Sequence, residues 1–190
     1  MRRILLLASL SVLVTAVPAF AGLANGSFEP VAAAPAPVAG DPAAIPGWIA
    51  SARGVAWLAT SGDDFAAPNG DFVVRLANDA GGAGCVEQAF ATTPGERYDV
   101  AFWLGSMADA ASTGRAALRV IVAGTARTLA IDNPSAGLLW QAHAFTFTAR
   151  AAVTTLSFRG VPAARASAAW LDGVAVNPAA TGTGSSRDSR

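Results

Sequence analysis

The sequence predicts an all-β fold in which short antiparallel strands form a two-sheet β-sandwich. Apolar and polar residues alternate with a period of two along several segments, as expected for strands with one buried face. Turn sequences rich in Gly, Asn, Asp and Pro separate these segments at regular spacing. No stretch carries a sustained helical period, so about nine to eleven short strands account for the fold.

The first 21 residues have the features of a secretory signal peptide. Two arginines precede an apolar run from Ile4 to about Val17, and Ala19-Phe20-Ala21 supplies the small residues of a cleavage site. This run is too short to span a bilayer comfortably, and no second apolar run of about 20 residues follows. We therefore expect residues 1–21 to be removed, leaving a soluble secreted or periplasmic protein without a membrane span.

Residues 22–178 are expected to form one domain, followed by a disordered polar tail over residues 179–190. Without the signal peptide, 11 basic residues remain against 13 acidic ones, a net charge near −2. This charge gives no electrostatic basis for binding nucleic acid. The single cysteine, Cys85, cannot form an intrachain disulfide, and its place in a predicted strand favours burial.

The N-terminal part contains two short predicted strands and a proline-rich connection. Residues 22–29 are expected to form the first strand, anchored by Phe28. Residues 30–46 consist almost entirely of Pro, Ala, Val and Gly, which favours an extended surface loop. A second short strand is expected over residues 55–58.

The central stretch, residues 69–106, predicts three strands joined by two turns. In the third of these strands, Tyr98 and Phe102 belong to the apolar series, whereas Trp103 has the opposite parity and should face away from the core. The core positions expected from this alternation are Phe72, Val74, Leu76, Val86, Phe90, Tyr98, Val100, Phe102 and Leu104.

Five further strands are expected in the C-terminal half. Residues 115–122 and 127–131 should form a hairpin around Ala123-Gly124-Thr125. One-sided strands are expected over residues 140–149 and 154–159, and the last strand over residues 169–176.

Several motifs in this order resemble those of the bacterial choice-of-anchor C proteins and the domain-of-unknown-function 642 proteins of plant cell walls. The motifs are Asn25-Gly26-Ser27-Phe28-Glu29, Ile45-Pro46-Gly47-Trp48, Val55-Ala56-Trp57, Gln88 to Gly95 with Tyr98 and Phe102, Trp140, Phe145 to Ala149, and Leu171-Asp172-Gly173-Val174. More remotely, the chain is similar to carbohydrate-binding modules with a galactose-binding-like jelly roll.

The resemblance implies an extracellular jelly-roll β-sandwich that binds polysaccharide or matrix and performs no chemistry. The leading function is therefore binding of a polysaccharide or cell-wall glycan. The alternative is a structural or adhesive envelope protein with a protein partner. A hydrolase is the least favoured class, because His143 is the only histidine and no Gly-x-Ser-x-Gly motif occurs.

Trp103, Arg75 and Trp57 are the candidate carbohydrate-binding residues. Trp103 has small neighbours and outward parity, which suits stacking of an aromatic ring on the apolar face of a sugar. Arg75 also has outward parity and could hydrogen-bond hydroxyls or a uronate carboxylate. Trp57 lies in a strand too short to define its face, and packing in the core or at its rim is the alternative for these tryptophans.

Glu29 and Asp172 are the candidate ligands of a structural Ca²⁺. They come from the first and last predicted strands, which lie close together in many jelly rolls, and related carbohydrate-binding modules hold calcium at this kind of place. Carboxylate oxygens completed by backbone carbonyls and water suit Ca²⁺. The alternative is that Glu29 accepts backbone amides of a turn and Asp172 caps the end of a strand.

Overall fold

The protein, described by a computed structural model, contains ten β-strands within the described part of the chain. The structure describes residues 22–30, 45–51, 53–60, 66–76, 83–110, 112–161, 163 and 165–180. The predicted signal peptide, most of the proline-rich loop and nearly all of the predicted tail lie outside these residues. The strands are β1 (Ile49–Ala50), β2 (Ala56–Ala59), β3 (Phe72–Leu76), β4 (Cys85–Ala91), β5 (Arg97–Ala108), β6 (Arg115–Val122), β7 (Thr125–Asp132), β8 (Gly137–Thr148), β9 (Val153–Gly160) and β10 (Ala169–Pro178).

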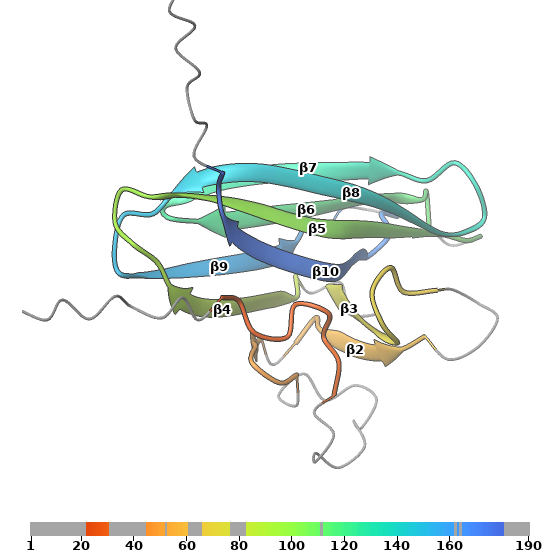
Figure 1. Ribbon diagram of the computed structural model, residues 1–190. Coiled ribbons are helices and arrows are strands. Elements are labelled where there is room, and N and C mark those ends of the chain that lie inside the picture. Colours follow the sequence, from red (N-terminus) through yellow and green to blue (C-terminus); the bar gives the residue numbers. More distant parts are fainter. Residues whose placement is uncertain are drawn as a thin grey trace, which may run out of the picture.

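The strands form two five-stranded antiparallel sheets that pack face to face as a jelly-roll β-sandwich (Figure 1). Sheet A has the order β1-β4-β9-β6-β7, and sheet B has the order β2-β3-β10-β5-β8. The last strand, β10, lies inside sheet B between β3 and β5 (Figure 1). The predicted fold class is therefore confirmed, as is the β6–β7 hairpin.

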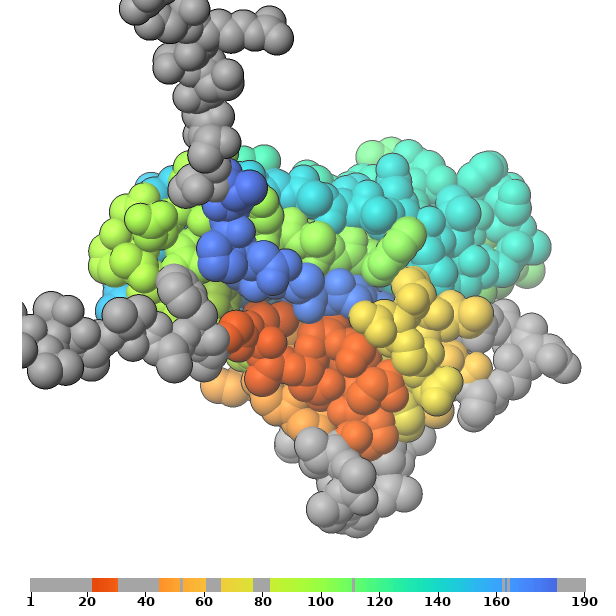
Figure 2. Space-filling model, viewed as in Figure 1, coloured from red at the N-terminus to blue at the C-terminus, as the bar shows by residue number. Residues whose placement is uncertain are grey.

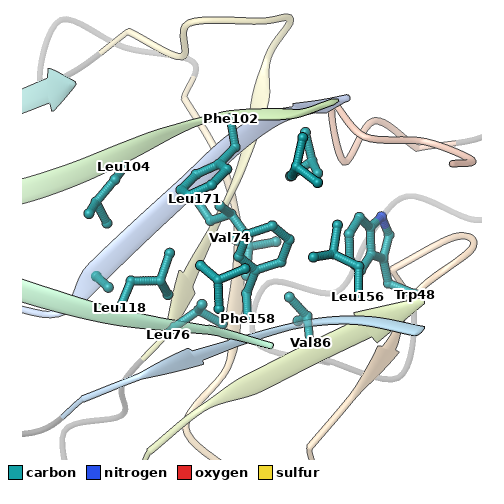
Figure 3. Close-up of a cluster of buried hydrophobic side chains, with 14 of the residues drawn as sticks. Trp48, Val74, Leu76, Val86, Phe102, Leu104, Leu118, Leu156, Phe158 and Leu171 are labelled. Atoms are coloured by element: carbon teal, nitrogen blue, oxygen red, sulfur yellow. The ribbon is translucent and has the colours of Figure 1, made fainter. Parts of the chain in front are cut away.

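Alternating side chains from both sheets fill the space between them (Figure 3). Along β5 the predicted core residues are buried and the residues between them are exposed up to Trp103. At the centre, Phe102 of sheet B meets Phe158 of sheet A edge to face, with ring centroids 5.0 Å apart. Both rings are buried, so the core ties the two sheets together.

The predicted first strand over residues 22–29 is wrong, because this segment forms a turn. Asn25 and Phe28 have φ angles of 48° and 59°, and the amide of Phe28 donates to the carbonyl of Asn25. Phe28 is nevertheless completely buried, as its role as an anchor predicts. In Figure 2 the segment, coloured red, lies against β10 in blue and against residues 66–76 in yellow.

A bulge interrupts the pairing of β10 with β5. Asp172 pairs with Trp103, but the next paired residue of β10 is Ala175, which faces Ala101. Gly173 within the bulge has a φ of +58°, a left-handed conformation that favours glycine. The amide of Val174 leaves the ladder and donates to the carbonyl of Gly26, which joins the N-terminal turn to the last strand.

Candidate functional site

Trp103 is the exposed aromatic residue on the outer face of sheet B, as its parity predicts. It keeps 38% of its surface exposed and lies on β5 between Ala142 of β8 and Asp172 of β10. One edge of the indole lies against the bulge, since a Cβ placed on Gly173 would be 2.9 Å from Cδ1 of Trp103. The bulge therefore positions the ring, and part of it stays open to solvent.

Small side chains make a low surface beside Trp103. Ala101 lies two residues before it on the same face of β5 and pairs with Ala144 of β8. Ala142, directly opposite Trp103, continues this row, and all three alanines are exposed. A planar ligand can therefore approach the indole without a bulky neighbour in its path.

Two further tryptophans share this face, on either side of Gly105. Trp140 of β8 and Trp170 of β10 both pair with Gly105 of β5. A Cβ on Gly105 would be 2.8 Å from Cε3 of Trp140, so the ring of Trp140 lies over the glycine. Its indole nitrogen donates to the carbonyl of Ala66 at 2.9 Å, and Trp170 is 5% exposed. No local sequence pattern connects these residues, although the inward parity of Leu171 places Trp170 on the outer face.

Arg75 lies on the same outer face as Trp103 but does not neighbour it directly. Arg75 is half-buried and pairs with Trp170 of β10, the strand that lies between β3 and β5. Two strand spacings put its backbone roughly 10 Å from that of β5. A ligand that contacts both Arg75 and Trp103 must therefore extend across β10.

Trp57 is a core residue, so its prediction as a carbohydrate contact is wrong. Its side chain is 2% exposed and packs on Phe72 with ring centroids 5.2 Å apart. Its indole nitrogen donates to the carbonyl of Phe28 at 2.8 Å, which satisfies the polar group inside the core. Trp57 pairs with Val74 and shares its inward face, a parity that a four-residue strand could not establish by sequence alone.

Glu29 and Asp172, the two candidate metal ligands, come together beneath the loop that precedes β3. Oε1 of Glu29 accepts the amides of Asp71 at 2.8 Å and Phe72 at 3.0 Å. The carboxylate of Asp172 accepts the amide of Asn69 at 2.8 Å and that of Gly173 at 2.6 Å. These bonds agree with the alternative in which the two carboxylates accept hydrogen bonds from backbone amides. Asp172 is also the strand partner of Trp103.

Burial raises the pKa of Asp172 to about 6 from the ordinary value of 3.8. The amide hydrogen bonds from Asn69 and Gly173 oppose this rise, and the negative charge of Glu29 adds to it. Asp172 is completely buried, so water contributes little to the stability of its charge. A cation between the two carboxylates would relieve both the burial cost and the repulsion.

The oxygen atoms of Glu29 and Asp172 are of the type that Ca²⁺ prefers, but two side chains supply fewer ligands than the ion needs. Both side chains offer hard oxygens, and Oε2 of Glu29 accepts no hydrogen bond from the described residues. Ca²⁺ takes about six to eight oxygen ligands. Since no three His, Cys, Asp or Glu side chains of the described residues are placed to hold one metal ion together, backbone carbonyls and water would supply the rest.

His143 occupies a structural position on β8. Its ring stacks on Phe102 at 5.7 Å, and burial lowers its pKa. Its Nε2 is buried and has no hydrogen-bond partner within the described chain. This geometry presents no solvent-facing base to a substrate.

Among the residues that the structure describes, no helix is long and apolar enough to cross a membrane.

The two packed antiparallel sheets make this protein a jelly-roll β-sandwich. Within this class, the chain belongs to the DUF642 family, proteins of unknown function, whose sequence model matches residues 21–177. No curated protein matches the chain.

Solved structures of several other proteins are similar to this chain. The arabinose-bound MgGH51 α-L-arabinofuranosidase is 14% identical with a TM-score of 0.54, covering 83% of this chain and 26% of that one. A CBM4 structure is 19% identical with a TM-score of 0.49, covering 82% and 99%. TmCBM61 in complex with β-1,4-galactotriose is 15% identical with a TM-score of 0.48, covering 83% and 94%. At these identities the similarity concerns the fold.

Proposed function

We propose that this protein is a secreted or periplasmic domain that binds a polysaccharide or cell-wall glycan and has no catalytic activity. The observation that carries the proposal is the exposed indole of Trp103 beside a row of exposed alanines on the outer face of sheet B. Sugars combine apolar C–H faces with polar edges, so a flat aromatic ring with open surroundings is a suitable platform.

Polar groups at the margins of this face suit the hydroxyls of a sugar chain. Arg75 lies at one side, two strands from Trp103. Toward the other end of β5, Asp99 accepts a hydrogen bond from the hydroxyl of Thr146 at 2.7 Å, and both lie near the alanine row. The open shape favours a ligand that lies along the face over a small molecule that needs enclosure.

The test is binding of wild type and Trp103→Ala to a panel of neutral polysaccharides by glycan array and affinity electrophoresis. Loss of the stacking surface should weaken binding by about tenfold or more. Trp103→Phe should retain part of the affinity because it keeps an aromatic face. Ile49→Ala, which removes a 69% exposed apolar side chain from sheet A, is the matched control and should bind as wild type does.

Thermal unfolding and near-ultraviolet circular dichroism must show that Trp103→Ala is folded. If the folded variant binds every glycan as tightly as wild type, the site is not at Trp103. If wild type binds none of the panel, the proposal of a glycan site at Trp103 fails.

A structural Ca²⁺ held by Glu29 and Asp172 is a further part of this proposal. The cation would neutralise the buried carboxylate of Asp172 and the half-buried one of Glu29, with backbone carbonyls and water as remaining ligands. Added Ca²⁺ should raise the melting temperature, and a chelator should lower it. Glu29→Gln should abolish this response, and a melting temperature indifferent to Ca²⁺ and chelator in wild type would exclude the ion.

Adhesion through a protein partner is a second candidate function, favoured by β8. This strand of 12 residues ends sheet B and contains no Asp, Glu, Lys or Arg. Long uncharged edge strands are suited to pairing with another chain. Recovery of a specific protein partner by purified protein that binds no glycan, with loss of that partner when Thr146 is changed to Lys, would favour this function.

A further inference from the structure

The outer face of sheet A contains a hollow of about 440 Å³ that the proposed function does not use. We name it the arginine groove, with Arg150 and Arg159 in its lining and Glu87, Thr155 and Ser157 beside them. It follows β9 on the face opposite the core. Along β9 the outward residues from 153 to 159 span roughly 20 Å, enough for a chain of several sugar units.

Small residues keep this surface hollow. Ala123 and Gly124, at the turn between β6 and β7, belong to the lining. Nη1 of Arg150 would lie 3.1 Å from a Cβ on Gly124, so the guanidinium lies against this turn. Arg159 lies toward the other end of β9, which places a positive charge at each end of the groove.

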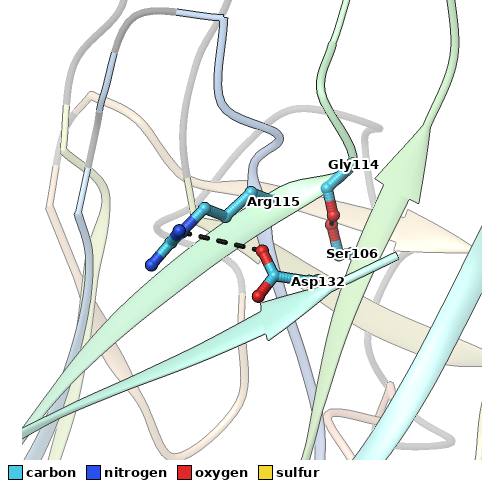
Figure 4. A network of polar contacts seen from close by, with 4 residues as sticks. All are labelled: Ser106, Gly114, Arg115 and Asp132. Atoms are coloured by element: carbon cyan, nitrogen blue, oxygen red, sulfur yellow. Dashed lines mark hydrogen bonds and ion pairs between the residues drawn. The ribbon is translucent and has the colours of Figure 1, made fainter. Parts of the chain in front are cut away.

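A third arginine lies next to the groove. Arg119 of β6 is directly opposite Arg159 of β9, and both side chains are exposed. Like charges in directly opposed positions destabilise a sheet. In contrast, Arg115 on the same strand as Arg119 forms an ion pair with Asp132, with 3.7 Å between Nε and Oδ1 (Figure 4).

The guanidinium groups of Arg119, Arg150 and Arg159 form no ion pair with any residue that the structure describes. A bound anion would satisfy the guanidinium donors and relieve the repulsion between Arg119 and Arg159. Guanidinium binds carboxylate in a bidentate geometry with charge-assisted hydrogen bonds.

The middle of the groove provides neutral donors and acceptors together with one carboxylate. Glu87 pairs with Ser157, and Ser157 pairs across to Ile121, so these three lie in one row of the sheet. Oγ of Ser157 is 3.2 Å from Sγ of the half-buried Cys85, which shows that the predicted burial of the thiol is incomplete. Hydroxyls and a carboxylate are suitable partners for the hydroxyls of a sugar.

We propose that the arginine groove binds a carboxylated polysaccharide, with uronate carboxylates on the arginines and sugar hydroxyls on Glu87 and its neighbours. One observation favours this ligand over nucleic acid. The lining contains no aromatic side chain on which a base could stack.

This site goes beyond the proposed function, because it uses the opposite sheet and a different chemistry. A chain held by Trp103 and a chain held by the arginine groove would lie on opposite faces of the sandwich. If both sites are occupied, one molecule connects two glycan chains.

The test is titration of polygalacturonate into the full folded protein by calorimetry, with chelator present so that calcium does not contribute. Fully methyl-esterified polygalacturonate is the uncharged match for the polymer, and a single-stranded oligonucleotide is the competing polyanion. The ester should bind at least about tenfold more weakly, and affinity for the acid should fall as salt rises.

Arg150→Gln and Arg159→Gln should each weaken polygalacturonate binding by about tenfold, the effect of losing a charge-assisted hydrogen bond. Arg115→Gln removes a charge from the same face outside the lining and is the matched control, expected within about twofold of wild type. Trp103→Ala should also leave this binding unchanged.

Four results would overturn the proposal. They are equal binding of the ester and the acid, wild-type affinity in both groove variants, oligonucleotide binding as tight as that of polygalacturonate, or loss of binding in Trp103→Ala alone. Because the neutral-glycan test depends on Trp103 and this test on Arg150 and Arg159, failure of one leaves the other standing.

Discussion

The two sheets have the same number of strands but opposite outer chemistry. The outer face of sheet B carries Trp103, Trp140 and the buried Trp170, whereas the outward positions of sheet A carry arginines, Glu87, hydroxyls and small or aliphatic residues and no aromatic residue. The inward positions of both sheets contribute buried apolar side chains to one core. The packing of the sandwich therefore constrains the inward residues of both sheets. The outward residues are not constrained in this way and can carry different binding chemistry on each side.

The largest expected effect comes from a substitution in the bulge of β10, which should disturb the outer face of sheet B more than that of sheet A. In Gly173→Ala the left-handed backbone is strained, and the new Cβ lies 2.9 Å from Cδ1 of Trp103. Strain and displacement together should lower the free energy of unfolding by roughly 3 kcal/mol. Chemical denaturation measures this, and binding to sheet B should weaken more than binding to the arginine groove.

Gly95→Ala is the matched control for this change. Gly95 also has a positive φ, +87°, but a Cβ there would meet nothing within 4 Å. It should cost only the backbone strain, about 1–2 kcal/mol, and leave both binding sites intact. Equal losses in the two variants would mean that contact between the bulge and Trp103 contributes nothing.

The second prediction concerns the pH dependence of the metal-free protein. Asp172 has a folded pKa of about 6 against an ordinary 3.8, so the folded state binds this proton more tightly than the unfolded state does. Protonation between these values therefore favours folding. As pH falls from about 7 to about 4, Asp172 should add up to about 3 kcal/mol of stability, at about 1.4 kcal/mol per pKa unit.

The measurement is the free energy of unfolding against pH, with chelator present, for wild type and Asp172→Asn. The variant should lack this contribution, so the difference between the two curves isolates it from that of other carboxyl groups. Asp99→Asn, which changes an exposed carboxylate on the same sheet, should follow wild type. Parallel curves for wild type and Asp172→Asn would show that the pKa of Asp172 is not raised.

Much of the fold could be predicted because strand periodicity is a local property. The alternation from Tyr98 to Leu104 places the core side of β5 and the outward direction of Trp103, and both are confirmed. The turn after Val122 predicts the β6–β7 hairpin for the same reason. Where the periodic signal is short it fails, as it does for Trp57 in the four residues of β2.

The N-terminal segment shows a second limit of local patterns. Phe28 is apolar and buried as predicted, yet its backbone forms a turn with positive φ. The contacts that stabilise this turn come from distant parts of the chain, including the amides of Asp71 and Phe72 on Glu29. A short apolar pattern predicts burial more reliably than it predicts strand pairing.

The sequence alone determined the all-β class, the core positions of the long strands and the outward direction of Trp103, because each depends on neighbours in the chain. Only the tertiary structure decided which outward residues meet. Strand order places Trp103 beside Asp172 and Arg119 opposite Arg159, and the bulge at Gly173 holds the indole. These contacts join residues far apart in the chain, and strand pairing across the sheets is set by the packing of the whole core.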